Sequence, residues 1–143
     1  ADFYLKNKRF VEAAEHYLLL EKAKRLPNRA SILNNLAFSL MATDNLKAQV
    51  YAEQAVELQP NSAAIVDTYG WILFKNKKFE HALKILNQAK SIDSTNTEIR
   101  YHLAETLMQL SRNAEAKVEL TYVLTKSRSK AELELANNLL SQL

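Results

Sequence analysis

The clearest hydrophobic pattern lies between residues 61 and 93, where it predicts two amphipathic helices joined by a polar turn. Apolar residues recur there at intervals of three and four positions, which is the spacing of one buried helical face. They are Ile65, Tyr69, Ile72 and Leu73 in the first helix and Phe79, Ala82, Leu83, Leu86 and Ala89 in the second. The segment between them, residues 75–78, is too polar for a core. Because two such helices cannot cover each other's apolar surface, we expect neighbouring helices.

The same pattern recurs along the chain with a period of about 34 residues. Leu103, Ala104 and Leu107 lie 34 positions after Tyr69, Gly70 and Leu73, whereas Leu36, Ala37 and Leu40 lie 33 positions before them. In the second helices the matching positions are Ala48 and Ala55, then Ala82, Leu86 and Ala89, then Ala116 and Leu120. A helix pair with this period resembles the tetratricopeptide repeat (TPR) in residue class and spacing.

The resemblance implies an all-α fold: a right-handed TPR superhelix, or α-solenoid, of three full helix-turn-helix repeats with an N-terminal half repeat and a C-terminal capping helix. The composition agrees, because one glycine and two prolines in 143 residues leave little room for hairpins. We expect a single domain with a partial repeat at 1–26, full repeats at 29–61, 62–95 and 96–128, and the capping helix at 129–143. Gly70 should let a packing helix approach closely, since no side chain intervenes.

The first residues predict only half a repeat. Asn7, Lys8 and Arg9 match the later turn at 76–78, so we expect a turn there and a helix from Phe10 to Lys24. Half a repeat leaves an apolar face without a cap. We therefore expect a piece of a longer array, and this face would also allow a homodimer.

Further expectations concern helix ends and helix faces. Thr95 with Glu98, and Ser129 with Glu132, have the spacing of a capping box. The second helix of the first full repeat is expected to bury Leu46, Ala48, Val50 or Tyr51, Ala52 and Ala55. The capping helix is expected to extend the apolar stripe through Leu135, Leu139 and Leu143.

Charge and composition narrow the classes of partner. The net charge is +3, but basic and acidic residues alternate along the helices and form no separate basic stripe, so we do not expect nucleic acid binding. The chain has no cysteine, which excludes disulfides and thiolate metal sites. No apolar run approaches the roughly 20 residues that cross a bilayer, so we expect no direct membrane insertion of this segment.

The residues that carry chemistry predict no enzyme, no cofactor and no metal. His16, His81 and His102 are 65 and 21 residues apart, and we expect none of them to pair with another ligand type at a helical spacing such as four residues. Because a zinc site needs three or four convergent ligands, we expect the histidines at the surface or rim. Gly70 alone cannot form a phosphate-binding loop or a nucleophile elbow. The prediction is therefore a protein or peptide partner.

The resemblance implies where that partner binds, because the first helices of TPRs line a concave groove. The residues facing it that we expect to contact a partner are Asn34, Phe38, Asp67, Trp71, Lys75, Tyr101 and Glu105. Aromatic residues beside isolated polar groups are typical of recognition surfaces. The alternative is that Trp71 and Phe74 only pack against the adjacent repeat.

One use of the fold is disfavoured by residue type. TPR co-chaperones grip the C-terminal carboxylate of heat-shock chaperones with Lys, Asn and Arg side chains. The corresponding positions here are Asn34, Phe38, Thr68, Glu98 and His102. Lysine and arginine are missing from this set, and Glu98 would repel a carboxylate.

A narrower resemblance rests on three phrases, Asn-Asn-Leu-Ala at 34–37, Val-Asp-Thr-Tyr-Gly-Trp at 66–71 and Glu-Ile-Arg-Tyr-His-Leu-Ala at 98–104. They resemble the C-terminal repeats of bacterial TPR lipoproteins associated with PEP-CTERM sorting and exopolysaccharide loci. Tyr69 in a leucine slot and Phe38 where tryptophan is common depart from that pattern. The resemblance implies a periplasmic or outer-membrane-associated scaffold for polysaccharide export or protein sorting. A rigid spacer within a longer array and a cytosolic adaptor are the alternatives.

Overall fold

The computed structural model describes residues 2–20 and 28–143, and within these ranges the chain is helical, without a β-strand. The described helices are α1 (Asp2–Leu20), α2 (Arg29–Leu40), α3 (Asn45–Leu58), α4 (Ala63–Lys75), α5 (Phe79–Ile92), α6 (Thr97–Gln109), α7 (Asn113–Lys126) and α8 (Lys130–Leu140). Short turns join α2 to α3, α4 to α5 and α6 to α7, so these helices form three hairpin pairs.

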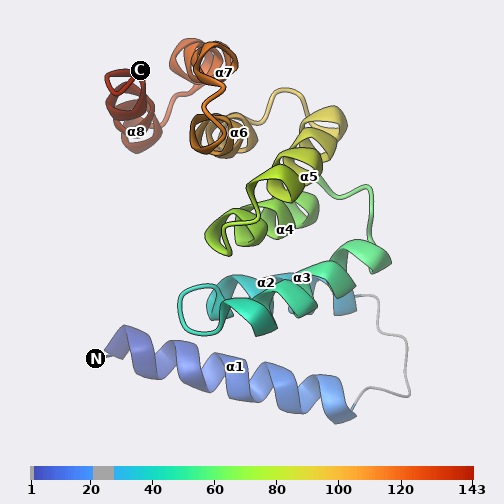
Figure 1. Ribbon diagram of the computed structural model, residues 1–143. Coiled ribbons are helices and arrows are strands. Elements are labelled where there is room, and N and C mark those ends of the chain that lie inside the picture. The colour runs from blue at the N-terminus through green and yellow to red at the C-terminus, as the bar shows by residue number, and fades with distance from the viewer. Residues whose placement is uncertain (1, 21–27) are drawn as a thin grey trace.

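The helices stack one after another from α1 at one end to α8 at the other (Figure 1). The first helices of the pairs, α2, α4 and α6, contact one another in sequence, and α8 packs on α6 and α7. Each second helix packs between its own partner and the first helix of the next pair. This is the predicted all-α TPR solenoid, with α8 in the place of the capping helix.

The core repeats with the sequence. Leu36, Leu73, Leu86, Leu103 and Leu120 are almost completely buried. Burying a leucine side chain contributes about 1.5–3 kcal/mol, so this repeated set supplies much of the driving force for stacking. The second helices contribute alanines at their contact positions, which lets neighbouring helices approach closely. The buried alanines of α3, α5 and α7 are Ala48, Ala52, Ala55, Ala82, Ala89 and Ala116.

Gly70 marks the closest approach of α4 and α5. A Cβ atom at this position would lie 2.7 Å from both Cδ2 and Cγ of Leu86, which is itself fully buried. The predicted role of Gly70 in close helix packing is therefore confirmed.

The helix ends follow standard capping chemistry. Asp44, Ser62, Asn96 and Ser129 each accept a hydrogen bond from the backbone N–H three residues later. The predicted cap at Ser129 is thus confirmed, with Oγ 3.3 Å from Glu132 N. The reciprocal half of the predicted capping box is wrong, because the Ser129 N–H donates to Ser127 Oγ at 3.2 Å and not to Glu132. The predicted cap at Thr95 is wrong by one residue, because Asn96 occupies the cap and its Oδ1 accepts from Ile99 N at 3.1 Å.

The expected turn at Asn7, Lys8 and Arg9 is also wrong, since α1 runs through it without interruption. The segment 2–20 contains no residue of positive φ, whereas Lys77 in the turn at 76–78 has a φ of 61°. Asn7 instead donates a hydrogen bond from Nδ2 to the carbonyl of Ser39 in α2, at 2.9 Å. The predicted continuation of the helix to Lys24 lies outside the described residues.

Two expected apolar faces are shifted. Leu46 is 74% exposed and Val50 is also exposed, whereas Tyr51, the alternative to Val50, is partly buried against the core beside the buried alanines of α3. In α8 the buried residue is Ala136 and Leu139 is partly buried, whereas Leu135 and Leu143 are exposed. Both errors arise because large side chains were assigned to the core where the close contacts between helices admit only alanine.

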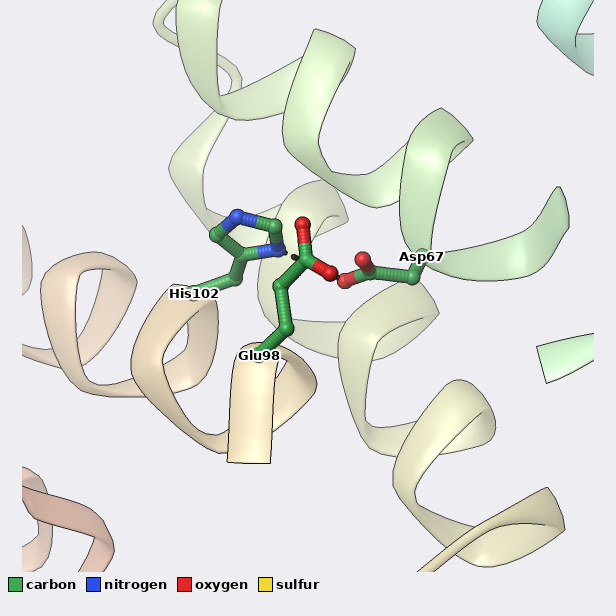
Figure 2. Close-up of side chains that lie close together, drawn as sticks. All are labelled: Asp67, Glu98 and His102. Atoms are coloured by element: carbon green, nitrogen blue, oxygen red, sulfur yellow. Dashed lines mark hydrogen bonds and ion pairs between the residues drawn. The ribbon is translucent and has the colours of Figure 1, made fainter. Parts of the chain in front are cut away.

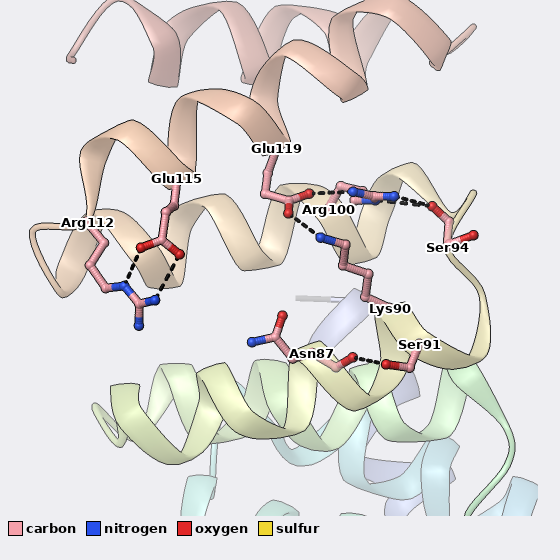
Figure 3. Close-up of polar contacts among 8 residues, drawn as sticks. All are labelled: Asn87, Lys90, Ser91, Ser94, Arg100, Arg112, Glu115 and Glu119. Carbon is pink, nitrogen blue, oxygen red and sulfur yellow. Dashed lines mark hydrogen bonds and ion pairs between the residues drawn. The ribbon is translucent and has the colours of Figure 1, made fainter.

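Charged groups also tie successive helices together at the outer side of the last repeats (Figure 3). Glu119 on α7 is 6% exposed and lies between Lys90 Nζ of α5, at 2.6 Å, and Arg100 Nη1 of α6, at 3.0 Å. Arg100 also donates to the carbonyl of Ser94 from Nε and Nη2.

No helix in the described part of the chain combines the length and apolar character needed to span a membrane.

Candidate partner-binding groove

The residues predicted to contact a partner lie on the helices that form one layer of the solenoid. Asn34 and Phe38 are on α2, Asp67, Trp71 and Lys75 on α4, and Tyr101 and Glu105 on α6. Within each helix they are four positions apart, so they share one face. We call the surface formed by these seven residues the groove face.

Trp71 is the centre of an aromatic cluster on this face. Its ring stacks on Phe74 with centroids 4.6 Å apart and on His102 of the next repeat at 4.1 Å. Lys75 Nζ lies 4.8 Å from the centroid of the Trp71 ring, within the range of a cation–π interaction. The packing against the adjacent repeat that we considered as the alternative is therefore present, while Trp71 remains only half-buried.

Asp67 and His102 form a buried pair between α4 and α6. Their residues are 7% and 8% exposed, and His102 Nδ1 donates to Asp67 Oδ1 at 2.8 Å. A buried carboxylate needs such a partner to offset its lost hydration. The prediction of a surface or rim position is wrong for His102, whereas His16 and His81 are exposed.

Tyr101 and Glu105 form the next polar pair along α6, with the Tyr101 hydroxyl donating to Glu105 Oε1 at 3.2 Å. Burial raises the pKa of Tyr101 to about 12, and the negative charge and hydrogen bond of Glu105 act in the same direction. The Tyr101 hydroxyl therefore stays protonated, as a donor, at physiological pH.

An open pocket of about 630 Å³ lies at the α1 side of the groove face. Its walls come from α1, α2, the start of α3 and the end of α4, and the lining residues are Asn7, Phe38, Ser39, Met41, Ala42, Asn45 and Lys75. Phe38 is 65% exposed and so presents most of its ring to this space. Asn34 is half-buried one turn away, and its Oδ1 has no hydrogen-bond partner among the described residues.

A family model described as "Anaphase-promoting complex, cyclosome, subunit 3" matches residues 41–121, which is more than half of the chain. The chain belongs to this family of tetratricopeptide repeats. Comparison with curated proteins finds no match.

Solved TPR structures have the same fold. The translocator chaperone SycD of Yersinia enterocolitica type III secretion superposes with a TM-score of 0.74 at 17% identity, covering 82% of this chain and 92% of SycD. The first TPR domain of Spaghetti (RPAP3), bound to the HSP90 peptide SRMEEVD, gives 0.74 at 19% identity, covering 80% and 90%. MamA gives 0.74 at 17% identity, covering 99% and 90%. At identities of 17–19%, this similarity shows only that the chain shares the fold of these proteins.

One cluster on the groove face was missed by the sequence analysis. Glu98 on α6 lies beside the Asp67–His102 pair, and one ligand atom from each of the three residues falls within 4.8 Å of the other two (Figure 2). The sequence contained a signal for it. Glu98 stands four residues before His102 on one helix face, and Asp67 stands one repeat earlier, 35 residues before His102. The expectation that no histidine pairs with another ligand type at helical spacing is therefore wrong for His102.

Proposed function

We propose that this TPR protein is an interaction scaffold that binds a peptide or protein segment on its groove face. The observation that carries the proposal is the open pocket of about 630 Å³ lined by Phe38, Met41 and Lys75. Lys75 Nζ also lies 4.8 Å from the centroid of the Trp71 ring. Sites that bind ligands are concave and mostly apolar, with a few polar groups that fix orientation. An apolar side chain of the partner would enter this pocket, with Lys75 at its margin.

The charges of the groove face favour a partner segment with a basic rather than an acidic end. On α6, Glu105 on the groove face and the exposed Glu98 beside it offer two carboxylates, whereas Lys75 is the one cation of the groove face and Asp67 is buried against His102. The peptide in the RPAP3 complex is acidic at its C-terminus, with the sequence SRMEEVD. Like charges brought together in an interface disfavour binding, so we do not propose an acidic C-terminal peptide for this chain.

A finer proposal places the scaffold in exopolysaccharide export or protein sorting at the bacterial envelope. Its support is the resemblance of the segments 34–37, 66–71 and 98–104 to the repeats of envelope lipoproteins. The alternatives are a cytosolic adaptor and a rigid spacer that binds nothing. The envelope scaffold and the cytosolic adaptor both bind a partner, whereas the spacer does not. None of the three is an enzyme, so turnover of a substrate in a broad hydrolase screen would contradict all of them.

The groove is tested with peptides selected from a displayed library on the purified chain, followed by calorimetric measurement of Kd. Phe38→Ala is the main variant, because Phe38 is exposed and its loss leaves the core intact. We expect it to weaken binding by about 2 kcal/mol, roughly 30-fold, as for an interface hot spot. Val118→Ala is the matched control, an exposed apolar residue on α7, away from the groove face, and it should bind normally. Equal affinities for both variants would contradict the proposal.

The compartment is tested by capturing partners on the immobilised chain from separate envelope and cytosolic extracts of the source cell. A protein from the envelope extract that Phe38→Ala and Tyr101→Ala both lose would support the envelope scaffold. A groove-dependent partner from the cytosolic extract would instead support the adaptor. If neither extract supplies a groove-dependent partner, the spacer is favoured.

A further inference from the structure

The cluster of Asp67, Glu98 and His102 has the composition and placement of a metal site. Asp67 comes from α4 and the other two residues from α6, and their ligand atoms lie within 4.8 Å of one another (Figure 2). Two of the three residues, Asp67 and His102, are buried and held by their mutual hydrogen bond of 2.8 Å. Glu98 is exposed, at the open side of the cluster.

We propose that these three residues bind a divalent transition-metal ion of the Zn²⁺ class. One imidazole nitrogen and two carboxylate oxygens are ligands that Zn²⁺ accepts, and neither thiolate nor a large oxygen cage is needed. Adjacent ligands of a tetrahedral Zn²⁺ lie roughly 3.4 Å apart, given bond lengths of about 2.0–2.2 Å. The observed separations of 2.8 Å to 4.8 Å bracket that value, and rotation of the exposed Glu98 side chain closes the longer gaps.

The charge around the cluster supports a cation. Among the described residues, the ion pairs that Lys and Arg side chains form go to Glu12, Glu15, Glu115 and Glu119, and the one such contact of Asp67 is with His102. The carboxylates of Asp67 and Glu98 therefore lie beside one imidazole and pair with no lysine or arginine of the described residues. A divalent ion would replace the proton on His102 Nδ1, and the neutral imidazole would keep its other proton on Nε2.

The neighbouring residues hold the cluster in place for such an ion. Trp71 stacks on the His102 ring at 4.1 Å with the planes only 17° apart, which limits rotation of the imidazole. The backbone carbonyl of His102 accepts a hydrogen bond from Thr106 Oγ1 at 2.8 Å. A bound ion would join α4 to α6 and thus connect two successive repeats, with its remaining coordination position toward the side of Glu98.

The single tryptophan gives this proposal a direct test, because it touches the proposed ligand. The metal-free full chain is titrated with Co²⁺, without peptide, while Trp71 fluorescence is recorded. We expect saturable quenching with a stoichiometry of one ion per chain, reversed by excess Zn²⁺. Zn²⁺ should also raise Tm, since an ion that binds only the folded state stabilises it.

Two matched variants decide whether the quenching reports this site. Glu98→Gln removes an exposed ligand and should weaken Co²⁺ binding at least tenfold, with an unchanged circular dichroism spectrum. Glu105→Gln removes another carboxylate from the same helix and should bind Co²⁺ as the unmodified chain does. Absence of saturable quenching, or equal Co²⁺ affinity in Glu98→Gln and the unmodified chain, would overturn the proposal. Because no peptide is present, either result is independent of the partner-binding test.

Discussion

At the scale of single residues, Tyr101 is the group on the groove face whose pKa is clearly raised above its ordinary value. Burial is the main cause of its raised pKa, followed by the negative charge of Glu105 and the hydrogen bond to it. Each of these disfavours the phenolate, so the folded state retains the proton at pH values where the unfolded chain has lost it.

This shift predicts a loss of stability at alkaline pH. The contribution of Tyr101 is complete below its unfolded pKa of about 10 and is lost as the pH rises to the folded pKa of about 12. Glu105→Gln removes the charge, so we expect the pKa of Tyr101 to fall but to stay above 10, because burial remains. Titration of ¹³C-labelled tyrosine by NMR, with Tyr101→Phe to assign the signal, measures it. An unchanged pKa in Glu105→Gln would show that Glu105 does not act on Tyr101.

The residues of the groove face also show what periodicity can and cannot predict. Asn34, Phe38, Trp71 and Tyr101 were placed on the correct helices because the repeat period fixes which positions share a face. The burial of His102 was not predicted, because its partners Asp67 and Trp71 belong to the preceding repeat. A pattern read along one helix shows which face is buried, but not which polar group on the next helix lies opposite.

At the scale of elements, the turns after α4 and α6 use the same backbone geometry. Lys77 and Ser111 adopt positive φ angles of 61° and 58°. After α4, Lys78 N donates to Leu73 O and Lys77 N to Phe74 O, both at 2.9 Å, which is the hydrogen-bond pattern of a Schellman motif. Glycine is the usual residue at the left-handed position, because a side chain there crowds the backbone.

Replacing Lys77 with glycine should therefore stabilise the protein. We expect a gain of roughly 0.5–1 kcal/mol, since relief of the left-handed strain exceeds the added freedom of the unfolded chain. Lys78→Gly is the control, because Lys78 has a φ of −92° and gains nothing from glycine. Urea denaturation measures both changes. Equal or lower stability of Lys77→Gly relative to Lys78→Gly would mean that the turn carries no such strain.

The sequence predicted which segments form helices, but it did not predict that residues 2–20 form one uninterrupted helix. The polar residues Asn7, Lys8 and Arg9 resemble a turn in letters, yet they lie within α1. The later turn contains a residue of positive φ, Lys77, and α1 contains none. Because neither segment contains glycine or proline, their polar residues alone do not distinguish a turn from a continuing helix.

At the scale of the whole molecule, each repeat contacts only its neighbours, so stability depends on the interfaces between successive helices. Most of these interfaces are apolar, but Glu119 adds a charged one by joining α5, α6 and α7 (Figure 3). The Arg100 guanidinium, which pairs with Glu119, also lies 4.1 Å from the centroid of the Tyr122 ring. Glu119 thus holds one cation from each of the two helices that precede its own.

Removing this carboxylate should destabilise the last repeats. We expect Glu119→Ala to lower the free energy of unfolding by about 3–5 kcal/mol, because Arg100 would be left largely buried without its partner. Glu115→Ala is the matched control: it is the same substitution on the same helix, but Glu115 pairs with Arg112 where both side chains are about half exposed. Such exposed pairs contribute little to stability, because solvent screens the charges. Urea denaturation at low and high salt separates the two, since added salt should shrink only the small effect of Glu115→Ala. Similar losses for both variants would mean that the buried Glu119 cluster contributes no more than an exposed ion pair, and that the repeats are held together by their apolar contacts alone.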